Sequence, residues 1–305
     1  MTNILIIGGS GCIGSGVSKW LIENAKVNKV ICASRGKTSS PKIPGAVYAK
    51  ADITDLDSLV NVMISHEVTH ILHTAALRTT DCHENPRLAT DINITGTANV
   101  YEAAHLAQTV KRVVFISTAA VYDQVEVQEE YVNEEAPTKG YATYVATKLA
   151  GEDLARSFSR EYEMEIIVIR PQILFGPSRG TEGSTAGVTN AIRALAQGKK
   201  FTIPFSGQYS FHFTEDVPAL LGSTLLKAVK EKFSIYNLPG DSIDIKEIVE
   251  ILNSFTGEKL ITYKEKQYPF AQSVCYKKFT ENFGKVQLSP FKQALNKSFK
   301  HFPKT

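Results

Sequence analysis

The chain opens with Ile4-Leu5-Ile6-Ile7-Gly8-Gly9-Ser10-Gly11-Cys12-Ile13-Gly14, an apolar run that leads directly into a glycine-rich turn. The run predicts a buried strand, and the apolar spacing after it predicts a helix over 13–24. Glycines between a strand and a helix allow a tight turn and bring a pyrophosphate close to the free amides of the helix start. The turn therefore predicts a dinucleotide site, with Gly8, Ser10, Gly11, Cys12, Ile13 and Gly14 as its phosphate-binding residues.

Short β-branched runs alternate with longer helical patterns through the first 170 residues. Further strands are predicted at Val30–Ala33, Ala46–Ala49, His70–Thr74, Arg112–Ser117 and Ile166–Arg170, and further helices over 55–65, 88–107 and 141–161. Such alternation is typical of an α/β protein with a Rossmann-like, doubly wound parallel sheet, which binds ligands at its carboxyl edge. We expect this domain to span 1–172. Residues 173–305 should form a smaller substrate-binding lobe that returns a strand near Ile235 and Tyr236 to the main sheet.

Bulk properties exclude several classes of protein. The net charge of +3 and the lack of an arginine-rich stretch argue against a nucleic-acid partner. No apolar run reaches membrane-spanning length, the first strand leaves no room for a signal peptide, and four scattered cysteines suit a reducing compartment. We therefore expect a cytoplasmic protein with a small-molecule substrate and no membrane partner. His66, His70 and His73 fall at a helix end and at the two ends of one strand, so no metal site is predicted.

The end of the second strand bears on which dinucleotide binds. An acidic residue there would hold both ribose hydroxyls and repel a 2′-phosphate, but the chain has Ser34 and Arg35, with Lys37 nearby. A guanidinium can grip a phosphate with two hydrogen bonds, so NADP is favoured over NAD. After the third strand, Asp52 and Ile53 are placed to meet the adenine, although Asp52 could instead cap the next helix.

A second site is predicted 130 residues downstream. Tyr144 and Lys148 lie one turn apart on a predicted helix, and Thr118 ends a predicted strand. A tyrosine has a pKa near 10, so a basic role at neutral pH requires a lower pKa, for which the charges of Lys148 and a nicotinamide ring are the expected cause. Thr118 could hydrogen-bond the same substrate oxygen. The two sites together predict a redox enzyme.

At these residues the chain resembles the extended short-chain dehydrogenase/reductase family, the NAD(P)-dependent epimerases and dehydratases. The resemblance covers residues 3 to about 260 and rests on His73-Thr74-Ala75-Ala76, Asp91–Thr97, Ser117–Tyr122, Arg170-Pro171 and Phe175-Gly176-Pro177. It implies that Thr118, Tyr144 and Lys148 are catalytic, and that Thr74, Ala75, Ala76, Asn93, Lys148 and Pro171 help to hold the cofactor. It also implies that Arg78 lies near the cofactor phosphates or the substrate, that His73 is structural, and that helices 88–107 and 141–161 pair in a homodimer.

Departures from the family pattern narrow the reaction. Ala119 and Ala120 stand where family dehydratases carry an acid and a base, which leaves dehydrogenation, ketone reduction or 4-epimerisation. Ile173 and Tyr209 stand where nucleotide-sugar enzymes hold the diphosphate, so a sugar, sugar acid or polyol-like substrate without a nucleotide is favoured. The alternatives are a nucleotide-sugar 4-epimerase and a dinucleotide-sensing regulator. The predicted substrate contacts are Arg78, Thr118, Tyr144, Gln172, Arg179 and His212.

Two further expectations concern segments next to this site. The turn-rich stretch 176–187 leaves the carboxyl edge of the sheet, so we predict that it forms a lid over the substrate. Glu152 and Asp153 follow Lys148 on the same helix and are predicted to be surface charges rather than acid–base groups.

Overall fold

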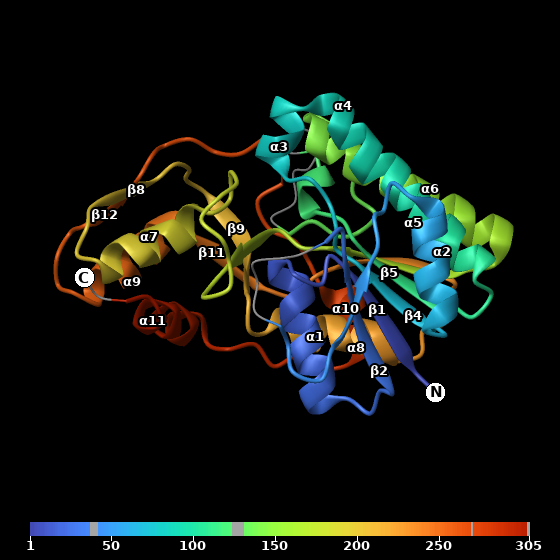
Figure 1. Cartoon of the computed structure of the whole chain (residues 1–305). Helices are drawn as coiled ribbons and strands as arrows, with labels where there is room; N and C mark the ends of the chain where they lie inside the picture. The colour runs from blue at the N-terminus through green and yellow to red at the C-terminus, as the bar shows by residue number, and fades with distance from the viewer. Residues whose placement is uncertain (37–41, 124–130, 270, 304–305) are drawn as a thin grey trace.

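Seven parallel strands form the central sheet of the protein, shown in Figure 1. The computed structural model describes residues 1–36, 42–123, 131–269 and 271–303. The strands run in the order β10-β6-β5-β4-β1-β2-β3. Their bounds are β1 (Asn3–Ile7), β2 (Lys29–Ser34), β3 (Val47–Lys50), β4 (His70–His73), β5 (Arg112–Ile116), β6 (Glu165–Arg170) and β10 (Phe233–Asn237). The predicted doubly wound sheet is confirmed.

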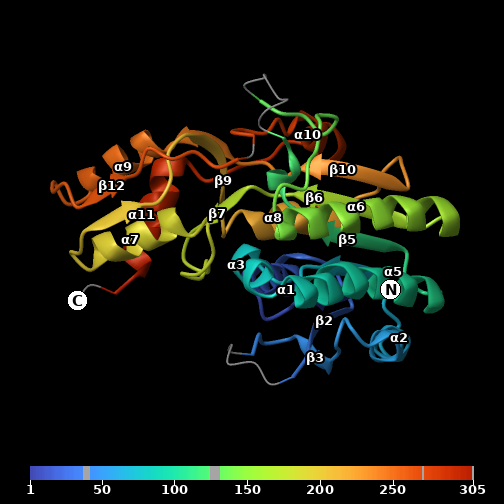
Figure 2. The ribbon, with the colours of Figure 1, turned by 90° about the horizontal axis from the view of Figure 1, so that it is seen from above.

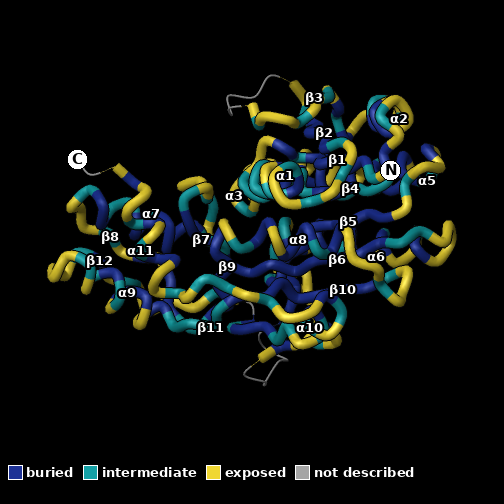
Figure 3. The backbone as a smooth tube through the Cα atoms, turned by 90° about the horizontal axis from the view of Figure 1, so that it is seen from below, coloured by how far each residue is buried: buried dark blue, intermediate teal, exposed yellow. Residues whose placement is uncertain are grey.

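Helices cover both faces of this sheet, because successive residues of each strand point to opposite sides. In β1, Ile4 and Ile6 pack with α1 (Cys12–Asn24), α8 (Val217–Leu226) and α10 (Lys277–Phe283). Leu5 and Ile7 pack on the other side, with α2 (Leu56–Ser65), α5 (Gly96–Leu106) and α6 (Thr143–Tyr162). Figure 2 shows the helices lying along the sheet, and Figure 3 shows that the central strands are buried throughout. Burial on both faces explains why these strands read as continuous apolar runs.

The predicted helix 88–107 differs from the structure. It is divided into α4 (Pro86–Ala89), a π-helical segment (Thr90–Thr95) and α5, and it is preceded by the short helix α3 (Thr79–Glu84). Buried Asn93 lies in the π segment, where its amide donates to the Leu77 carbonyl and to Thr147 Oγ1. A π turn of this kind is typical of functional sites, and periodicity alone does not reveal it.

The second lobe has its own core. A three-stranded sheet of β7 (Ile173–Phe175), β9 (Gln208–Phe213) and β11 (Asp241–Asp244) lies beside a strand pair, β8 (Phe201–Ile203) and β12 (Ile261–Tyr263). Helices α7 (Gly187–Ala196), α9 (Ile245–Ser254) and α11 (Phe291–His301) pack around them. The chain returns to the main lobe twice, first with α8 and β10 and then with α10, and β10 pairs with β6 in parallel.

The order in which the chain adds strands to the sheet reverses between β1 and β4. The chain leaves β1 toward β2 and β3, whereas β4, β5 and β6 lie on the other side of β1. A crevice forms at such a point, at the carboxyl ends of the strands. The loops after β1, β2, β4, β5 and β6 all open into it. Within the described residues, no helix combines the length and apolarity that crossing a bilayer requires.

Candidate active site

The turn after β1 has no room for side chains. Gly8 has φ +89°, and a Cβ there would lie 2.5 Å from Thr74 Oγ1. A Cβ on Gly14 would lie 2.3 Å from the Gly8 carbonyl oxygen, and the Gly11 amide donates to that same oxygen at 2.9 Å. Gly11 also begins α1, and no side chain caps that helix start. The open amides and the bare backbone fit the pyrophosphate of a dinucleotide.

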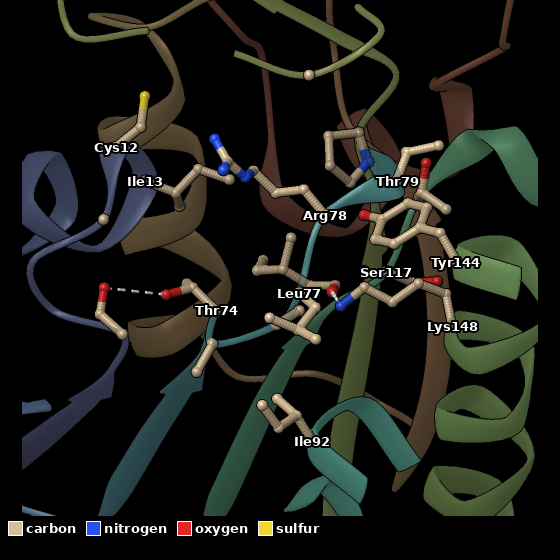
Figure 4. Close-up of a pocket in the computed structure, with 18 of the residues that line it drawn as sticks. Cys12, Ile13, Thr74, Leu77, Arg78, Thr79, Ile92, Ser117, Tyr144 and Lys148 are labelled. Atoms are coloured by element: carbon tan, nitrogen blue, oxygen red, sulfur yellow. Dashed lines mark hydrogen bonds between the residues drawn. The ribbon is translucent and has the colours of Figure 1, made fainter. Parts of the chain in front are cut away.

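A cavity of about 640 Å³ runs from this turn to α6, and Figure 4 shows part of its wall. Its size lies within the range of small-molecule sites. Of the predicted cofactor residues, Gly8, Ser10, Gly11, Cys12, Ile13, Ser34, Arg35, Asp52, Ile53, Thr74, Ala75, Ala76, Lys148 and Pro171 line it. The two sites predicted from distant parts of the sequence therefore share one cavity.

At the adenine end, Arg35 and Asp52 face each other across the ends of β2 and β3. The Asp52 carboxylate accepts hydrogen bonds from the amide and hydroxyl of Thr54. These bonds and, to a smaller extent, Arg35 lower the pKa of Asp52. Asp55, rather than Asp52, caps α2, through the Ser58 amide. Lys37 lies outside the described residues.

Thr118 ends β5 at the middle of the cavity. It is 7% exposed, and its Oγ1 accepts a hydrogen bond from the Ala120 amide at 3.2 Å. Because the acceptor side of the hydroxyl is used in this way, its hydrogen is free to be donated to a substrate oxygen.

Lys148 lies one turn after Tyr144 on α6, and Figure 4 shows both side chains reaching into the cavity. The Lys148 Nζ donates to the Ile116 carbonyl at 2.8 Å and lies 6.0 Å from the centre of the Tyr144 ring. Burial lowers the pKa of Lys148 to about 8, against the opposing effect of the Glu152 carboxylate. The ammonium group therefore keeps its proton at pH 7 and has donors left for a ligand hydroxyl.

The Tyr144 phenol is a protonated group in the protein alone. Burial raises its pKa to about 12, with a smaller lowering effect from Arg179. The expectation that Lys148 and a nicotinamide ring lower this pKa concerns the protein with its cofactor bound, and it stays a prediction. Without a bound cofactor, the Tyr144 phenol is therefore a proton donor rather than a base.

Two predicted substrate contacts are engaged elsewhere. His212 lies outside the cavity wall, and that prediction is wrong: its Nε2 accepts from the Gln172 amide at 2.8 Å, and its Nδ1 is bonded to the Pro239 carbonyl. Gln172 does line the wall, but its side-chain amide is bonded to the Ala271 carbonyl and the Ser210 amide. Both residues fasten the cavity wall to β9.

Gly14 and Asn93 lie behind the wall rather than in it. Gly14 supports the turn from below, as its contact with Gly8 shows. The Asn93 Oδ1 accepts from the Leu77 amide at 2.7 Å and so fixes the loop after β4.

Glu152 is not a surface charge, which corrects the prediction. Its side chain is 5% exposed and accepts from both Nε and Nη2 of Arg170, at 3.0 and 2.5 Å. Its other partner is the Ser117 hydroxyl. The side chain points inward because it lies on the face of α6 that also carries Lys148. Asp153 is exposed, as predicted.

The loop 176–186 contributes Arg179, Gly183, Ser184 and Thr185 to the cavity wall, and its predicted role as a lid stays a prediction. Arg78 Nη2 on the β4 loop pairs with Glu182 at 2.8 Å, and the Cys12 and Ser178 side chains approach to 3.6 Å. The Tyr268 hydroxyl donates to the Ser184 carbonyl. Sequence patterns missed part of this wall, namely Tyr141, Leu174, Ser184, Thr185, Tyr268 and Pro269. Tyr141 could have been suspected from its closeness to Tyr144, whereas Tyr268 and Pro269 come from a segment without any recognisable motif.

The histidines give no metal site among the described residues, where no three His, Cys, Asp or Glu side chains group to hold an ion. Buried His73 is bonded through Nε2 to the Thr97 hydroxyl at 3.0 Å.

Comparisons with known proteins agree with this geometry. The model of the NAD dependent epimerase/dehydratase family matches residues 4–238. An Arabidopsis thaliana protein, a trifunctional UDP-glucose 4,6-dehydratase, UDP-4-keto-6-deoxy-D-glucose 3,5-epimerase and UDP-4-keto-L-rhamnose-reductase, is 27% identical over 287 residues. That alignment covers 88% of this chain but only 42% of the plant protein. D-erythronate dehydrogenase of Haemophilus influenzae is 23% identical over 269 residues, covering 85% of this chain and 84% of the enzyme.

Among solved structures, UDP-glucose 4-epimerase of Thermotoga maritima with UDP-glucose superposes with a TM-score of 0.86 at 23% identity. The superposition covers 98% of each chain. At this identity the likeness concerns the fold.

Proposed function

The chain belongs to the NAD dependent epimerase/dehydratase family, and from that premise we propose that it transfers hydride between NADP(H) and a secondary alcohol or ketone of a sugar-like or polyol-like molecule without a nucleotide. The observation that carries this proposal is the meeting of Thr118, Tyr144 and Lys148 with the glycine turn in one cavity. As a member of its family it is an NAD(P)-dependent enzyme of the extended short-chain dehydrogenase/reductase type. Its relatives act on sugar substrates.

When bound, the nicotinamide supplies or accepts the hydride, and the protein handles the proton. For ketone reduction, the Thr118 hydroxyl donates a hydrogen bond to the carbonyl oxygen. Tyr144, protonated because its pKa is raised to about 12, gives that oxygen its proton as the hydride reaches the carbon. Lys148 is placed to bind the ribose hydroxyls with its free donors. In the oxidative direction Tyr144 must receive a proton, and a positive charge in the cavity would lower its pKa toward that role.

NADP is proposed over NAD because Arg35 lines the adenine end, where a 2′-phosphate would lie. We also propose a homodimer through α5 and α6, supported by the exposed side chains of Leu106 and Tyr162 at the ends of these helices. Four free thiols favour a reducing compartment, the cytoplasm.

The alternative is a nucleotide-sugar 4-epimerase, which the names of several relatives and solved structures suggest. Two observations weigh against it. Ile173 and Tyr209, at the positions aligned with diphosphate-binding groups, are fully buried in the second core and do not line the cavity. With UDP- or dTDP-sugars at modest excess we therefore expect almost no rise in Tm, and a shift of several degrees would favour the epimerase.

The proposal is tested by Tyr144→Phe, with Tyr162→Phe on the exposed end of the same helix as its matched control. Tyr144→Phe should bind NADPH nearly as wild type does, while turnover falls by about 10²- to 10⁴-fold. Tyr162→Phe should keep full turnover. Full activity in Tyr144→Phe would refute the catalytic assignment.

A second measurement identifies the nucleotide that purified protein releases on heating. A protein that is empty, and then binds NADPH more tightly than NADH, supports an enzyme that exchanges its cofactor at each turnover. Tightly held NAD(H) would instead support an epimerase, because such an enzyme keeps its cofactor between oxidation and re-reduction.

A further inference from the structure

Arg179 is a cation at the substrate end of the cavity that no carboxylate neutralises. It lies in the loop between β7 and α7, and its Nη1 donates to the carbonyl oxygens of Gly180 and Glu182, at 3.1 and 3.0 Å. No ion pair joins it to any Asp or Glu among the described residues. Arg78, by contrast, is paired with both Asp81 and Glu182. The loop therefore holds the Arg179 guanidinium by its backbone and leaves its charge for a ligand.

The lining of the cavity also carries more positive than negative charge. The charged residues among its described lining are four cations, Arg35, Arg78, Lys148 and Arg179, and one carboxylate, Asp52. Asp52 lies at the adenine end. The substrate end is thus cationic. Burial, together with the nearby charge of Arg78, lowers the pKa of Arg179, because both disfavour its charged form. An anion bound beside Arg179 would offset this cost and would therefore be stabilised there.

Both arginines line the cavity. Figure 4 shows the Arg78 side chain extending toward Cys12 and Ile13, where the phosphates of a dinucleotide would lie. The neighbour of Arg179 in the loop, Ser178, approaches the Cys12 side chain to 3.6 Å. Burial raises the pKa of both Cys12 and Tyr144, and the Arg179 charge offsets part of each rise. An anion bound to Arg179 would therefore lie between the glycine turn and the catalytic proton donor.

The rest of the substrate end suits a small hydroxylated molecule. Ser184 and Thr185 line it beside the hydroxyl groups of Tyr141 and Tyr268. Among the described lining residues there is no arginine besides Arg35, Arg78 and Arg179 to bind a nucleotide diphosphate.

We propose that the substrate is a nucleotide-free hydroxy acid, or the corresponding oxo acid, whose carboxylate is received by Arg179 while Tyr144 and Thr118 hold the reacting oxygen. This inference rests on the proposed function. In the oxidative direction, the carbinol carbon gives its hydride to NADP⁺ and its hydroxyl proton passes to Tyr144. The hydroxy acid becomes an oxo acid, and NADPH and one proton are the other products. A guanidinium suits this role because its planar fork matches a carboxylate.

The first experiment compares aldonates of four to six carbons with the alditols of the same length, each with NADP⁺, by the appearance of NADPH. Wild type should oxidise at least one aldonate about 100-fold or more efficiently, in kcat/KM, than its matched alditol. Arg179→Gln should raise the KM for the acid about tenfold or more and leave the Kd for NADPH within twofold. Arg179→Lys should recover part of the loss, and Arg87→Gln, an exposed arginine on α4, should behave as wild type.

Two results would overturn the inference. Alditols that react as well as the acids would show that no carboxylate is recognised. An Arg179→Gln variant whose NADPH binding weakens as much as its use of the acid would assign Arg179 to the cofactor phosphates.

A binding experiment tests the carboxylate site independently of the proposed reaction. Aldonates are titrated into the protein with NADPH bound, and the nucleotide fluorescence is followed in wild type and Arg179→Gln. Binding that Arg179→Gln loses, without turnover of any compound, would uphold the carboxylate site and count against the proposed reaction. If no acid binds and none is turned over, the carboxylate site is overturned.

Discussion

The two ends of the cavity are built in different ways. The cofactor end is made by loops that follow β1, β2, β3 and β4, which are neighbours in one sheet and close in sequence. The substrate end is assembled from 141–144, 171–185 and 268–269, which include a loop and a segment of the second lobe. One sheet edge fixes the first end, whereas the packing of two lobes fixes the second. The cofactor end is thus the part that local sequence can specify.

The two ends also differ in how much space they leave. A Cβ on Gly8 or Gly14 would collide with backbone or with Thr74, while a Cβ on Gly180 would meet nothing within 4 Å.

The largest expected effect lies where the two ends join. Arg170 precedes the wall residues Pro171 and Gln172, and its buried pair with Glu152 ties β6 to α6. Glu152→Gln should lower the free energy of unfolding by about 3–5 kcal/mol, because a buried guanidinium loses its counter-charge. Asp153→Asn, exposed on the same helix, should change it by less than about 0.5 kcal/mol. Urea denaturation at pH 7 measures both, and equal stabilities would contradict a structural role for the pair.

Gly14→Ala tests the rigidity of the cofactor end. Its Cβ would lie 2.3 Å from the Gly8 carbonyl oxygen, so the turn must move and NADPH binding should weaken by about 10- to 100-fold. Gly180→Ala, in open space at the substrate end, should leave the Kd for NADPH unchanged. Fluorescence titration gives the Kd for NADPH of both variants. Similar values would show that the two ends of the cavity do not differ in rigidity.

Arg35→Ala tests whether Arg35 contacts the 2′-phosphate of NADPH. Arg35 is exposed, so loss of its contact with a 2′-phosphate should weaken NADPH binding by a modest factor, about tenfold. NADH lacks that phosphate and should bind as before. Equal losses for the two nucleotides in a titration would refute the phosphate contact.

The smallest effect is a pH dependence at the junction of the two ends. Burial lowers the pKa of Lys148 to about 8, so its ammonium is charged below pH 8 and neutral above it. Since the charged form is the one placed to bind the ribose, kcat/KM for reduction should be level up to about pH 8. It should then fall, by at most about tenfold per pH unit. Tyr144, with a pKa of about 12, stays protonated throughout. A level profile up to pH 10 would show that Lys148 does not titrate there.

Sequence patterns predicted β1 to β6 to within about a residue, together with the glycine turn and the spacing of Tyr144 and Lys148, but none of the strands of the second lobe. They failed where side-chain direction depends on packing between elements. Glu152 reads as a surface charge because charged residues at helical spacing usually face solvent, and only the position of Arg170 on β6 explains its burial. His212 reads as a free imidazole, yet backbone groups of Gln172 and Pro239 occupy both of its nitrogens.

The sequence by itself determined the strands of the main sheet, the glycine turn and the spacing of Tyr144 and Lys148, because each depends on residues within one strand, turn or helix. Only the tertiary structure decided the substrate end. Two contacts of loop 176–186 join distant parts of the chain: Glu182 pairs with Arg78, 104 residues away, and Ser184 accepts from Tyr268, 84 residues away. Periodicity and short motifs describe neighbours along the chain, whereas the packing of the two lobes sets which distant residues meet.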